Sequence, residues 1–335
     1  MSKPRIFICS PITKGGLDRL KAVAEIEMNP DSSKPLSKDG IIAGVKKADI
    51  LYGVMHDKID ADVIAANPRL RGICTSAVNT LYIDVAAATA RKIPVTIIPH
   101  IVVIPTADQC MAMILAVARR TVTGHNLILK GIYPGGQSNY LLGTAVTGKV
   151  LALVGGSGRI AKQVAKRALG FDMKIIYWDP MRLPEAEERE LGMTYVTFDR
   201  LFTDGDFVSV HTPLLPDTHH QVGERELSLM KPSAYLINTS RGPVIDEPAM
   251  VRALVNKRIA GAALDVFEFE PKVPPELLTM DNVVLTPHLG SATYETRDEM
   301  ANLVADNIIA ILEGRVSPNC VNPEIYKHLT HPTAA

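Results

Sequence analysis

The chain has 335 residues, of which 47% are hydrophobic and 21% charged, a balance typical of a globular protein long enough for two domains. Its 36 basic and 36 acidic side chains cancel, so we expect no nucleic-acid partner. No apolar run approaches the roughly 18 residues of a membrane span, and the short apolar stretch after the first residues is no signal peptide, so we expect a cytoplasmic protein with no membrane contact. The four cysteines lie far apart, which predicts neither disulfides nor a zinc site, and we expect no metal.

The N-terminal part of the chain predicts a small parallel α/β domain. Short apolar runs alternate there with helical patterns such as 61–67 and 85–91, as expected for strands joined by helical crossovers. The expected strands are 5–9, 25–28, 49–54, 72–75 and 95–98. Five such strands make one doubly wound sheet.

A second α/β region follows a long helical pattern over 106–130 and a glycine-rich loop over 131–148. Its expected strands are 149–154, 173–178, 207–211, 234–238, 260–265 and 283–286. Six strands with helical crossovers match a full dinucleotide-binding sheet. A last helix is expected over 295–313.

The stretch GGSGRIA gives this second sheet a candidate cofactor loop. Gly156, Gly158 and Ala161 fit the spacing G-x-G-x-x-G, with alanine in the third place, where the pattern allows it. The loop lies between the apolar strand 149–154 and an amphipathic helix, the context that the motif requires. The backbone N–H groups at the start of that helix could bind a pyrophosphate.

The next strand ends in Asp179, which points to NAD as the cofactor. A carboxylate there accepts hydrogen bonds from the adenosine ribose and repels the 2′-phosphate of NADP. NADP is therefore less favoured. Arg182 could weaken this preference, although a solvated loop cation is the more ordinary interpretation.

Three later strands end next to residues that could carry chemistry. Arg241 follows one strand, Glu268 and Glu270 the next, and His288 the last. Since ligands bind at the carboxyl ends of parallel strands, we expect these side chains to converge. Arginine suits a carboxylate or carbonyl oxygen, and histidine can transfer a proton while a carboxylate orients it. Taken singly, each could be an ordinary surface charge. The histidine pair His219 and His220, which follows a Pro-Asp-Thr turn, is expected to be exposed in this ordinary way.

The chain resembles the NAD-dependent D-isomer-specific 2-hydroxyacid dehydrogenases, glyoxylate and hydroxypyruvate reductases among them. The motifs GGSGRIA, HTP, NTSRGPVIDE, AGAALDVFEFEP and TPHLGSAT carry this resemblance over nearly the whole length. It implies two doubly wound parallel-sheet domains: a flavodoxin-like substrate domain over 1–102 and 297–335, and an inserted Rossmann NAD-binding domain over 103–296. It also implies a homodimer formed through the long helix and the loop that follows.

The resemblance assigns roles to particular residues. The implied catalytic residues are Arg241, Glu270 and His288, because the family pattern D-V-F-x-x-E selects Glu270 over Glu268. The implied cofactor contacts are Thr106, Gly156, Ser157, Gly158, Arg159, Ile160, Asp179, His211, Thr212, Pro213, Thr218, Thr239, Ser240, Asp265, Gly290 and Ser291. The implied substrate contacts are Met55, Ala77, Val78, Asn79 and His100.

Two of these residues depart from the family pattern. Asn79 stands where glycine is usual, and asparagine tolerates positive φ, so we expect the turn to survive. His100 stands where a Pro-Gly pair is commoner. Met55 either lines the substrate site or is an ordinary buried methionine.

The activity implied is interconversion of a small 2-keto acid and its D-2-hydroxy acid. A phosphite dehydrogenase would keep the same arginine, glutamate and histidine, and so would a corepressor that senses NAD. A formate dehydrogenase would have glutamine in place of Glu270. The identity of the acid stays open.

Overall fold

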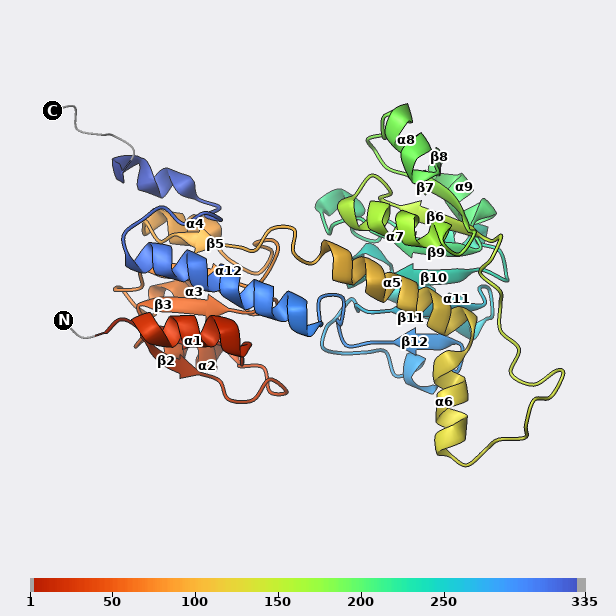
Figure 1. The fold of residues 1–335 in the computed structure, drawn as a ribbon, viewed down its shortest axis with the longest axis horizontal. Coiled ribbons are helices and arrows are strands. Elements are labelled where there is room, and N and C mark those ends of the chain that lie inside the picture. Colours follow the sequence, from red (N-terminus) through yellow and green to blue (C-terminus); the bar gives the residue numbers. More distant parts are fainter. Residues whose placement is uncertain (1–2, 330–335) are drawn as a thin grey trace. The chain divides into compact units, whose positions relative to one another are not determined.

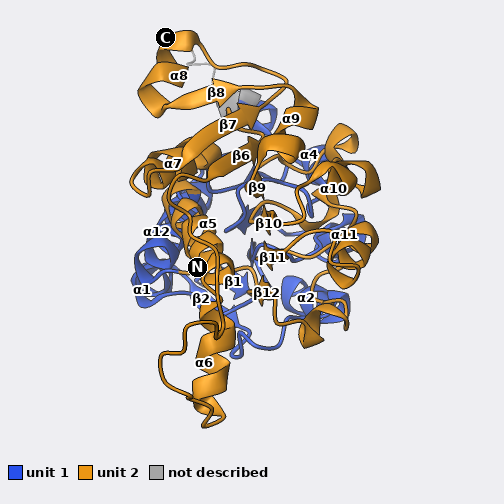
Figure 2. Cartoon of the chain, turned by 90° about the vertical axis from the view of Figure 1, so that its right-hand side faces the viewer, with its two compact units in different colours: residues 1–102, 293–335 blue, residues 103–292 orange. Residues whose placement is uncertain are grey.

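The computed structural model of the chain describes residues 3–329. It divides into two compact units, unit 1 with residues 1–102 and 293–335 and unit 2 with residues 103–292 (Figure 2). Residues 1–2 and 330–335 of the expected substrate domain lie outside the described part. The chain returns to unit 1 at Thr293, four residues before the expected boundary, because the Thr293 side chain accepts a hydrogen bond from the Thr296 N–H and caps the last long helix, α12 (Tyr294–Leu312).

Unit 1 is built on a five-stranded parallel sheet of order β2-β1-β3-β4-β5, the order of flavodoxin-like folds (Figure 1). Its strands are β1 (Arg5–Ile8), β2 (Glu25–Met28), β3 (Ile50–Gly53), β4 (Gly72–Thr75) and β5 (Val95–Thr96). Helices α1 (Lys14–Val23) and α12 bury their apolar side chains on one face. The other face is covered by α2 (Lys38–Val45), α3 (Ala61–Ala65) and α4 (Val85–Ala90).

Unit 2 contains a seven-stranded parallel sheet of order β12-β11-β10-β9-β6-β7-β8, the Rossmann order extended by one strand. Its strands are β6 (Val150–Val154), β7 (Lys174–Trp178), β8 (Met193–Tyr195), β9 (Phe207–Val210), β10 (Tyr235–Asn238), β11 (Gly261–Leu264) and β12 (Val283–Leu285). The expected count of six was wrong, since β8 was missed. This strand has three residues and pairs only with β7, at the sheet edge, so it lacks a long apolar run.

Helices cover both faces of this sheet, with α5 (Val103–Ala118) and α7 (Arg159–Leu169) on one side and α9 (Phe198–Asp204), α10 (Glu224–Leu229) and α11 (Glu247–Val255) on the other (Figure 2). Helix α8 (Glu185–Leu191) precedes β8. Short 3₁₀ turns occupy Pro216–Thr218, Gly242–Val244, Leu277–Thr279 and, in unit 1, Pro323–Leu329.

The helix expected over 106–130 is two helices, α5 and α6 (Thr121–Leu129). The break falls at Arg120, whose backbone is left-handed with φ of 52° and whose guanidinium pairs with Asp281. Helix α5 is buried, whereas α6 has no buried residue and extends with the following loop beyond the sheet of unit 2 (Figure 1). Within residues 3–329, the helices are too short or too polar to cross a membrane.

Candidate active site

The glycine-rich loop joins β6 to α7 at the centre of the unit 2 sheet. Its left-handed residue is Gly155, with φ of 79°, and a Cβ there would lie 2.9 Å from the Thr212 nitrogen. A Cβ on Gly156 would lie 2.4 Å from that of Tyr177. Both contacts are too short for any side chain. Ala161 is fully buried against the sheet, as a packing position should be.

Asp179 lies at the end of β7 and faces this loop. One carboxylate oxygen accepts a hydrogen bond from the Ser157 N–H at 3.3 Å, and the other accepts one from the Met181 N–H at 3.1 Å. Arg182 is exposed, as expected of a solvated loop cation, and it also forms an ion pair. Its guanidinium donates to both oxygens of Glu188 at 2.8 and 2.9 Å.

The loop after β9 offers a polar edge beside the glycines. The Thr212 hydroxyl oxygen is buried with no hydrogen-bond partner among the described residues, so it can accept or donate to a bound group. His211 lies within reach of Ser209, at 2.9 Å between Nε2 and Oγ, and burial lowers its pKa to about 4, which keeps the ring neutral. Thr218 differs from these, because its hydroxyl closes its own turn by donating to the Pro213 carbonyl at 2.6 Å.

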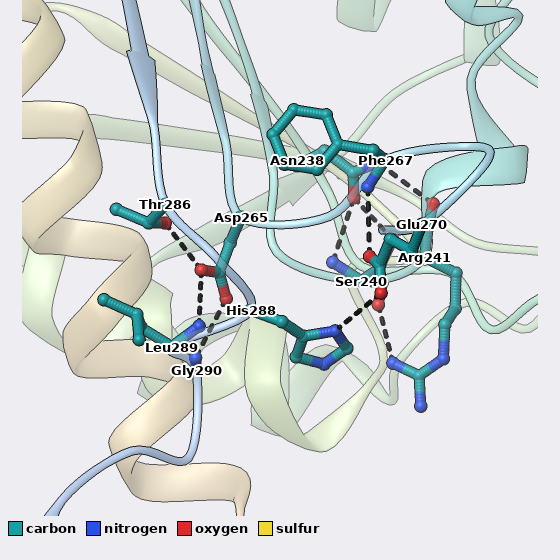
Figure 3. A network of polar contacts seen from close by, with 10 residues as sticks. All are labelled: Asn238, Ser240, Arg241, Asp265, Phe267, Glu270, Thr286, His288, Leu289 and Gly290. Atoms are coloured by element: carbon teal, nitrogen blue, oxygen red, sulfur yellow. Dashed lines mark hydrogen bonds and ion pairs between the residues drawn. The ribbon is translucent and has the colours of Figure 1, made fainter. Parts of the chain in front are cut away.

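The residues expected to be catalytic follow β10, β11 and β12, and Figure 3 shows how they lie. Arg241 directly follows Ser240 in the turn after β10, and its guanidinium donates to the Ser240 carbonyl at 2.6 Å. Asn238, at the end of β10, holds this turn. Its side-chain oxygen accepts from the Ser240 N–H at 2.9 Å, and its amide donates to the Arg241 carbonyl at 3.0 Å.

The turn with Arg241 packs directly on the loop with Glu270. A Cβ on Gly242 would lie 1.9 Å from the Phe267 carbonyl carbon, so the two backbones touch and only glycine fits. The Glu270 carboxylate accepts a hydrogen bond from the Phe267 N–H at 3.1 Å, which orients it within its own loop.

His288 meets Glu270 from the third loop. Its Nδ1 lies 3.3 Å from a Glu270 carboxylate oxygen, and the two side chains are 20% and 25% exposed, so both are accessible but largely shielded. The His288 N–H donates to the Asp265 carbonyl at 2.9 Å, and its φ is 55°, an uncommon value for histidine. The ring is therefore presented by a backbone conformation that the loop must enforce.

Asp265 is the residue that holds this loop. It is 1% exposed, and its carboxylate accepts from the N–H groups of Leu289 at 2.7 Å and Gly290 at 2.8 Å and from the Thr286 hydroxyl (Figure 3). Burial raises its pKa. The Gly290 carbonyl in turn accepts from Thr106 on α5 at 3.3 Å. Sequence reasoning placed Thr106, Asp265 and Gly290 in the cofactor set and missed this supporting role, as it missed Asn238 and Thr286. In the sequence, Asn238, Asp265 and Thr286 stand out only as polar residues at the end of a buried strand.

The other expected cofactor contacts lie on these same loops. Gly158 precedes the first turn of α7, which contains Arg159 and Ile160; Pro213 follows Thr212, Thr239 and Ser240 follow β10, and Ser291 follows Gly290.

The expected substrate contacts all belong to unit 1. Asn79 has no positive φ. Its side-chain oxygen instead accepts from the Leu81 N–H at 3.2 Å, so the turn at Ala77, Val78 and Asn79 is closed by a side chain. The left-handed residue is His100, with φ of 72°, which explains why glycine suits that position. Met55 is partly exposed, so the interpretation as an ordinary buried methionine was wrong.

Comparison with known proteins gives the family. Residues 111–290 match the model of the NAD-binding domain of the D-isomer-specific 2-hydroxyacid dehydrogenases. The chain is 44% identical over 327 residues to a glyoxylate reductase of Thermococcus litoralis, which covers 96% of this chain and 98% of that protein.

Solved structures agree with this assignment. A glyoxylate reductase from Paecilomyes thermophila superimposes with a TM-score of 0.79 at 31% identity, covering 97% of this chain and 100% of the other. An NADPH-dependent glyoxylate/hydroxypyruvate reductase from Sinorhizobium meliloti, in complex with NADP and malonate, gives 0.78 at 30% identity, with 96% and 98% covered. The chain therefore belongs to the D-isomer-specific 2-hydroxyacid dehydrogenase family, and it is an NAD-dependent oxidoreductase that interconverts 2-keto and 2-hydroxy acids.

Proposed function

We propose that this enzyme reduces a small 2-keto acid of the size of glyoxylate or hydroxypyruvate to the D-2-hydroxy acid, with His288 as the general acid. The observation that carries the proposal is the 3.3 Å pairing of His288 Nδ1 with Glu270, next to the turn that presents Arg241. Relatives named glyoxylate reductase, at up to 44% identity, support the choice of a small acid.

Glu270 determines which nitrogen of His288 exchanges the proton. Because Nδ1–H donates to the carboxylate, Nε2 would be the nitrogen that exchanges a proton with the substrate. In the reductive direction the imidazolium donates its Nε2 proton to the substrate oxygen as the carbonyl is reduced, and in the oxidative direction the neutral ring takes that proton back. A positioned acid of this kind contributes about 10² to 10⁴ in rate.

Arg241 would bind the substrate carboxylate and polarise the keto oxygen. A guanidinium offers two parallel N–H donors, which match the carboxylate and the neighbouring carbonyl of a 2-keto acid. The backbone turn at Ala77, Val78 and Asn79, together with Met55 and His100, stays a prediction for the rest of the substrate contacts.

The loop of Gly155 to Ile160 fits a dinucleotide, because Gly155 and Gly156 leave no room for side chains and the buried Thr212 hydroxyl has no hydrogen-bond partner among the described residues. Ser157, Gly158 and Arg159 would hold the pyrophosphate and Asp179 the ribose. When bound, the nicotinamide supplies or accepts the hydride at substrate C2. We propose NADH over NADPH, since the Asp179 carboxylate would repel a 2′-phosphate and Arg182 is paired with Glu188.

We further propose a cytoplasmic homodimer. Helix α6 and the loop after it expose a group of large apolar side chains that a second copy would cover: Ile128, Leu129, Ile132, Tyr133 and Leu142. All four cysteines are free thiols, which suits a reducing compartment.

A spectrophotometric assay against a panel of 2-keto acids, with NADH and NADPH, tests the proposal. We expect turnover of glyoxylate or hydroxypyruvate, and loss of about 10² to 10⁴ in kcat in His288→Ala with NADH affinity intact. Glu270→Gln should lower kcat as well, whereas Glu276→Gln, an exposed glutamate in the same segment, should not. Activity with phosphite alone would identify the alternative dehydrogenase. NADH binding without turnover of any acid would favour a corepressor-like role.

A further inference from the structure

A cluster of two histidines and one glutamate lies on unit 2 outside the residues proposed for catalysis. His219 and His220 follow the 3₁₀ turn Pro216–Thr218, and Glu268 lies in the loop after β11. One ligand atom from each of the three comes within 4.8 Å of the other two. We propose that His219, His220 and Glu268 form a binding site for a divalent transition-metal ion of the zinc type.

Glu268 is the fixed member of this site. Its side chain is only 8% exposed, unusual for a loop glutamate. One carboxylate oxygen lies 2.8 Å from His220 Nε2, and the other accepts the Glu247 N–H at 3.2 Å. The Glu247 carboxylate in turn accepts a hydrogen bond from the Glu268 N–H at 3.0 Å. Supporting hydrogen bonds of this kind orient the first ligands of metal sites.

The charges around Glu268 favour a bound cation. Glu247 is 5% exposed and contacts Glu268 through both its N–H and its carboxylate, so two carboxyl groups share one largely buried region. A divalent ion against Glu268 would offset the repulsion between them.

The two imidazoles are placed to complete the site. His220 has a left-handed backbone, with φ of 52°, and its N–H donates to the Pro243 carbonyl at 2.8 Å, so the chain holds it over Glu268. The ring centroids of His219 and His220 are 4.0 Å apart, with the planes tilted by 31°. Both histidines are exposed, so an ion reaches them from solvent.

The donor set selects the kind of ion. Two imidazole nitrogens and one carboxylate oxygen suit Zn²⁺ and its neighbours Ni²⁺ and Cu²⁺, whereas Mg²⁺ and Ca²⁺ prefer oxygen ligands throughout. Tetrahedral Zn²⁺ with bonds of about 2.1 Å places its ligand atoms about 3.4 Å apart. The present separations, from 2.8 Å to at most 4.8 Å, bracket that value, and small side-chain rotations reach it. Water would complete the coordination.

The ion would also stabilise the loop after β11, which contains Glu270. Glu268 precedes Glu270 by two residues, and a Cβ on Gly242 would lie 2.4 Å from the Glu268 nitrogen. The segments with Arg241 and Glu270 therefore lie directly behind the proposed site.

Isothermal titration of the tag-free, EDTA-treated enzyme with Zn²⁺ tests the site without any measure of activity. We expect saturable binding of one ion per chain at this site. His219→Ala and His220→Asn, the latter keeping a residue that tolerates positive φ, should each weaken it at least about tenfold. Co²⁺ should give a tetrahedral absorption spectrum in the wild type that the double variant lacks.

Matched controls separate this site from other histidines and carboxylates. His288→Ala should keep the ion, since the catalytic pair is not part of the site, and so should His125→Ala and Glu276→Gln. Zn²⁺ should raise the melting temperature of the wild type and not of the double variant. Wild-type enzyme without saturable binding, or a double variant that binds as tightly as the wild type, would overturn the proposal.

Discussion

Arg182 and Glu188 form a bidentate ion pair directly after β7, with N–O distances of 2.8 and 2.9 Å. The Tyr177 hydroxyl donates to the same carboxylate at 2.7 Å, and the Arg182 guanidinium lies 5.4 Å from the centre of the Tyr195 ring. Together, Arg182 and the Tyr177 hydroxyl hold the pKa of Glu188 down at about 2, so the pair is charged at neutral pH. Arg182, a cation that could accept a 2′-phosphate, is thus already neutralised.

Glu188→Gln should therefore shift cofactor use toward NADPH. The substitution removes the negative charge but keeps a hydrogen-bonding side chain for Tyr177, so Arg182 regains an uncompensated positive charge. We expect the ratio of kcat/KM with NADPH to that with NADH to rise about tenfold, equivalent to roughly 1.4 kcal/mol. Glu190→Gln, an exposed residue of the same helix α8, is the control. An unchanged ratio in Glu188→Gln would show that Arg182 does not limit NADPH use.

His211 should make folding stability fall in mild acid. Its pKa is lowered from 6.5 to about 4 by burial, so the unfolded chain takes up a proton at a higher pH than the folded enzyme does. Its stabilising contribution is complete above pH 6.5 and is lost as the pH falls toward about 4. Between pH 7 and pH 5 the wild type should lose up to about 2 kcal/mol more than His211→Asn, measured by urea unfolding. Parallel pH profiles for the two proteins would contradict this assignment.

Asp265→Asn should damage catalysis more than folding. The carboxylate holds the N–H groups of Leu289 and Gly290, which follow His288, and an amide would turn an NH₂ group toward one of these donors. Because burial already disfavours the charge on Asp265, its removal should offset part of the cost of the unpaired donor, so the melting temperature should fall only modestly. We expect kcat to fall about 10- to 100-fold from a misplaced imidazole. NADH affinity, measured by fluorescence, should fall less than kcat; an equal fall in both would make Asp265 a cofactor contact only.

The architecture could be predicted because each strand of a parallel sheet has a recognisable local sequence pattern. Buried strands such as β6 and β10 are short apolar runs, and their carboxyl ends lie on one edge of the sheet whatever the details of packing. That geometric rule indicated Arg241, His288 and the pair Glu268 and Glu270 before any contact was known, and the family pattern then selected Glu270.

The features that sequence reasoning missed depend on contacts between distant segments. Strand β8 pairs only at an edge, and α5 ends where Arg120 meets Asp281, far along the chain. The family pattern drew attention to both Asn79 and His100, and positive φ was expected at Asn79, yet of these two residues it is His100 that has it. The pairing of Glu268 with His220 joins residues 48 positions apart, so each looks like an ordinary loop residue until the chain is folded.

The apolar surface of α6 and the next loop should mediate dimerisation. Leu129 is 73% and Tyr133 77% exposed, and α6 buries none of its side chains within its own chain. Large exposed apolar groups that follow one another along the chain are typical of an interface, and two charges there would face their symmetry equivalents in a dimer.

We expect the double variant Leu129→Glu, Tyr133→Glu to sediment as a monomer at concentrations where the wild type is a dimer. Val255→Glu is the matched control, since Val255 is a 56% exposed apolar residue on α11, on the other face of the sheet. A single apolar side chain of that kind is normal on a monomer, so its replacement should leave the sedimentation coefficient unchanged. If Val255→Glu dissociates the enzyme and the α6 variant does not, the interface lies on the α11 face instead.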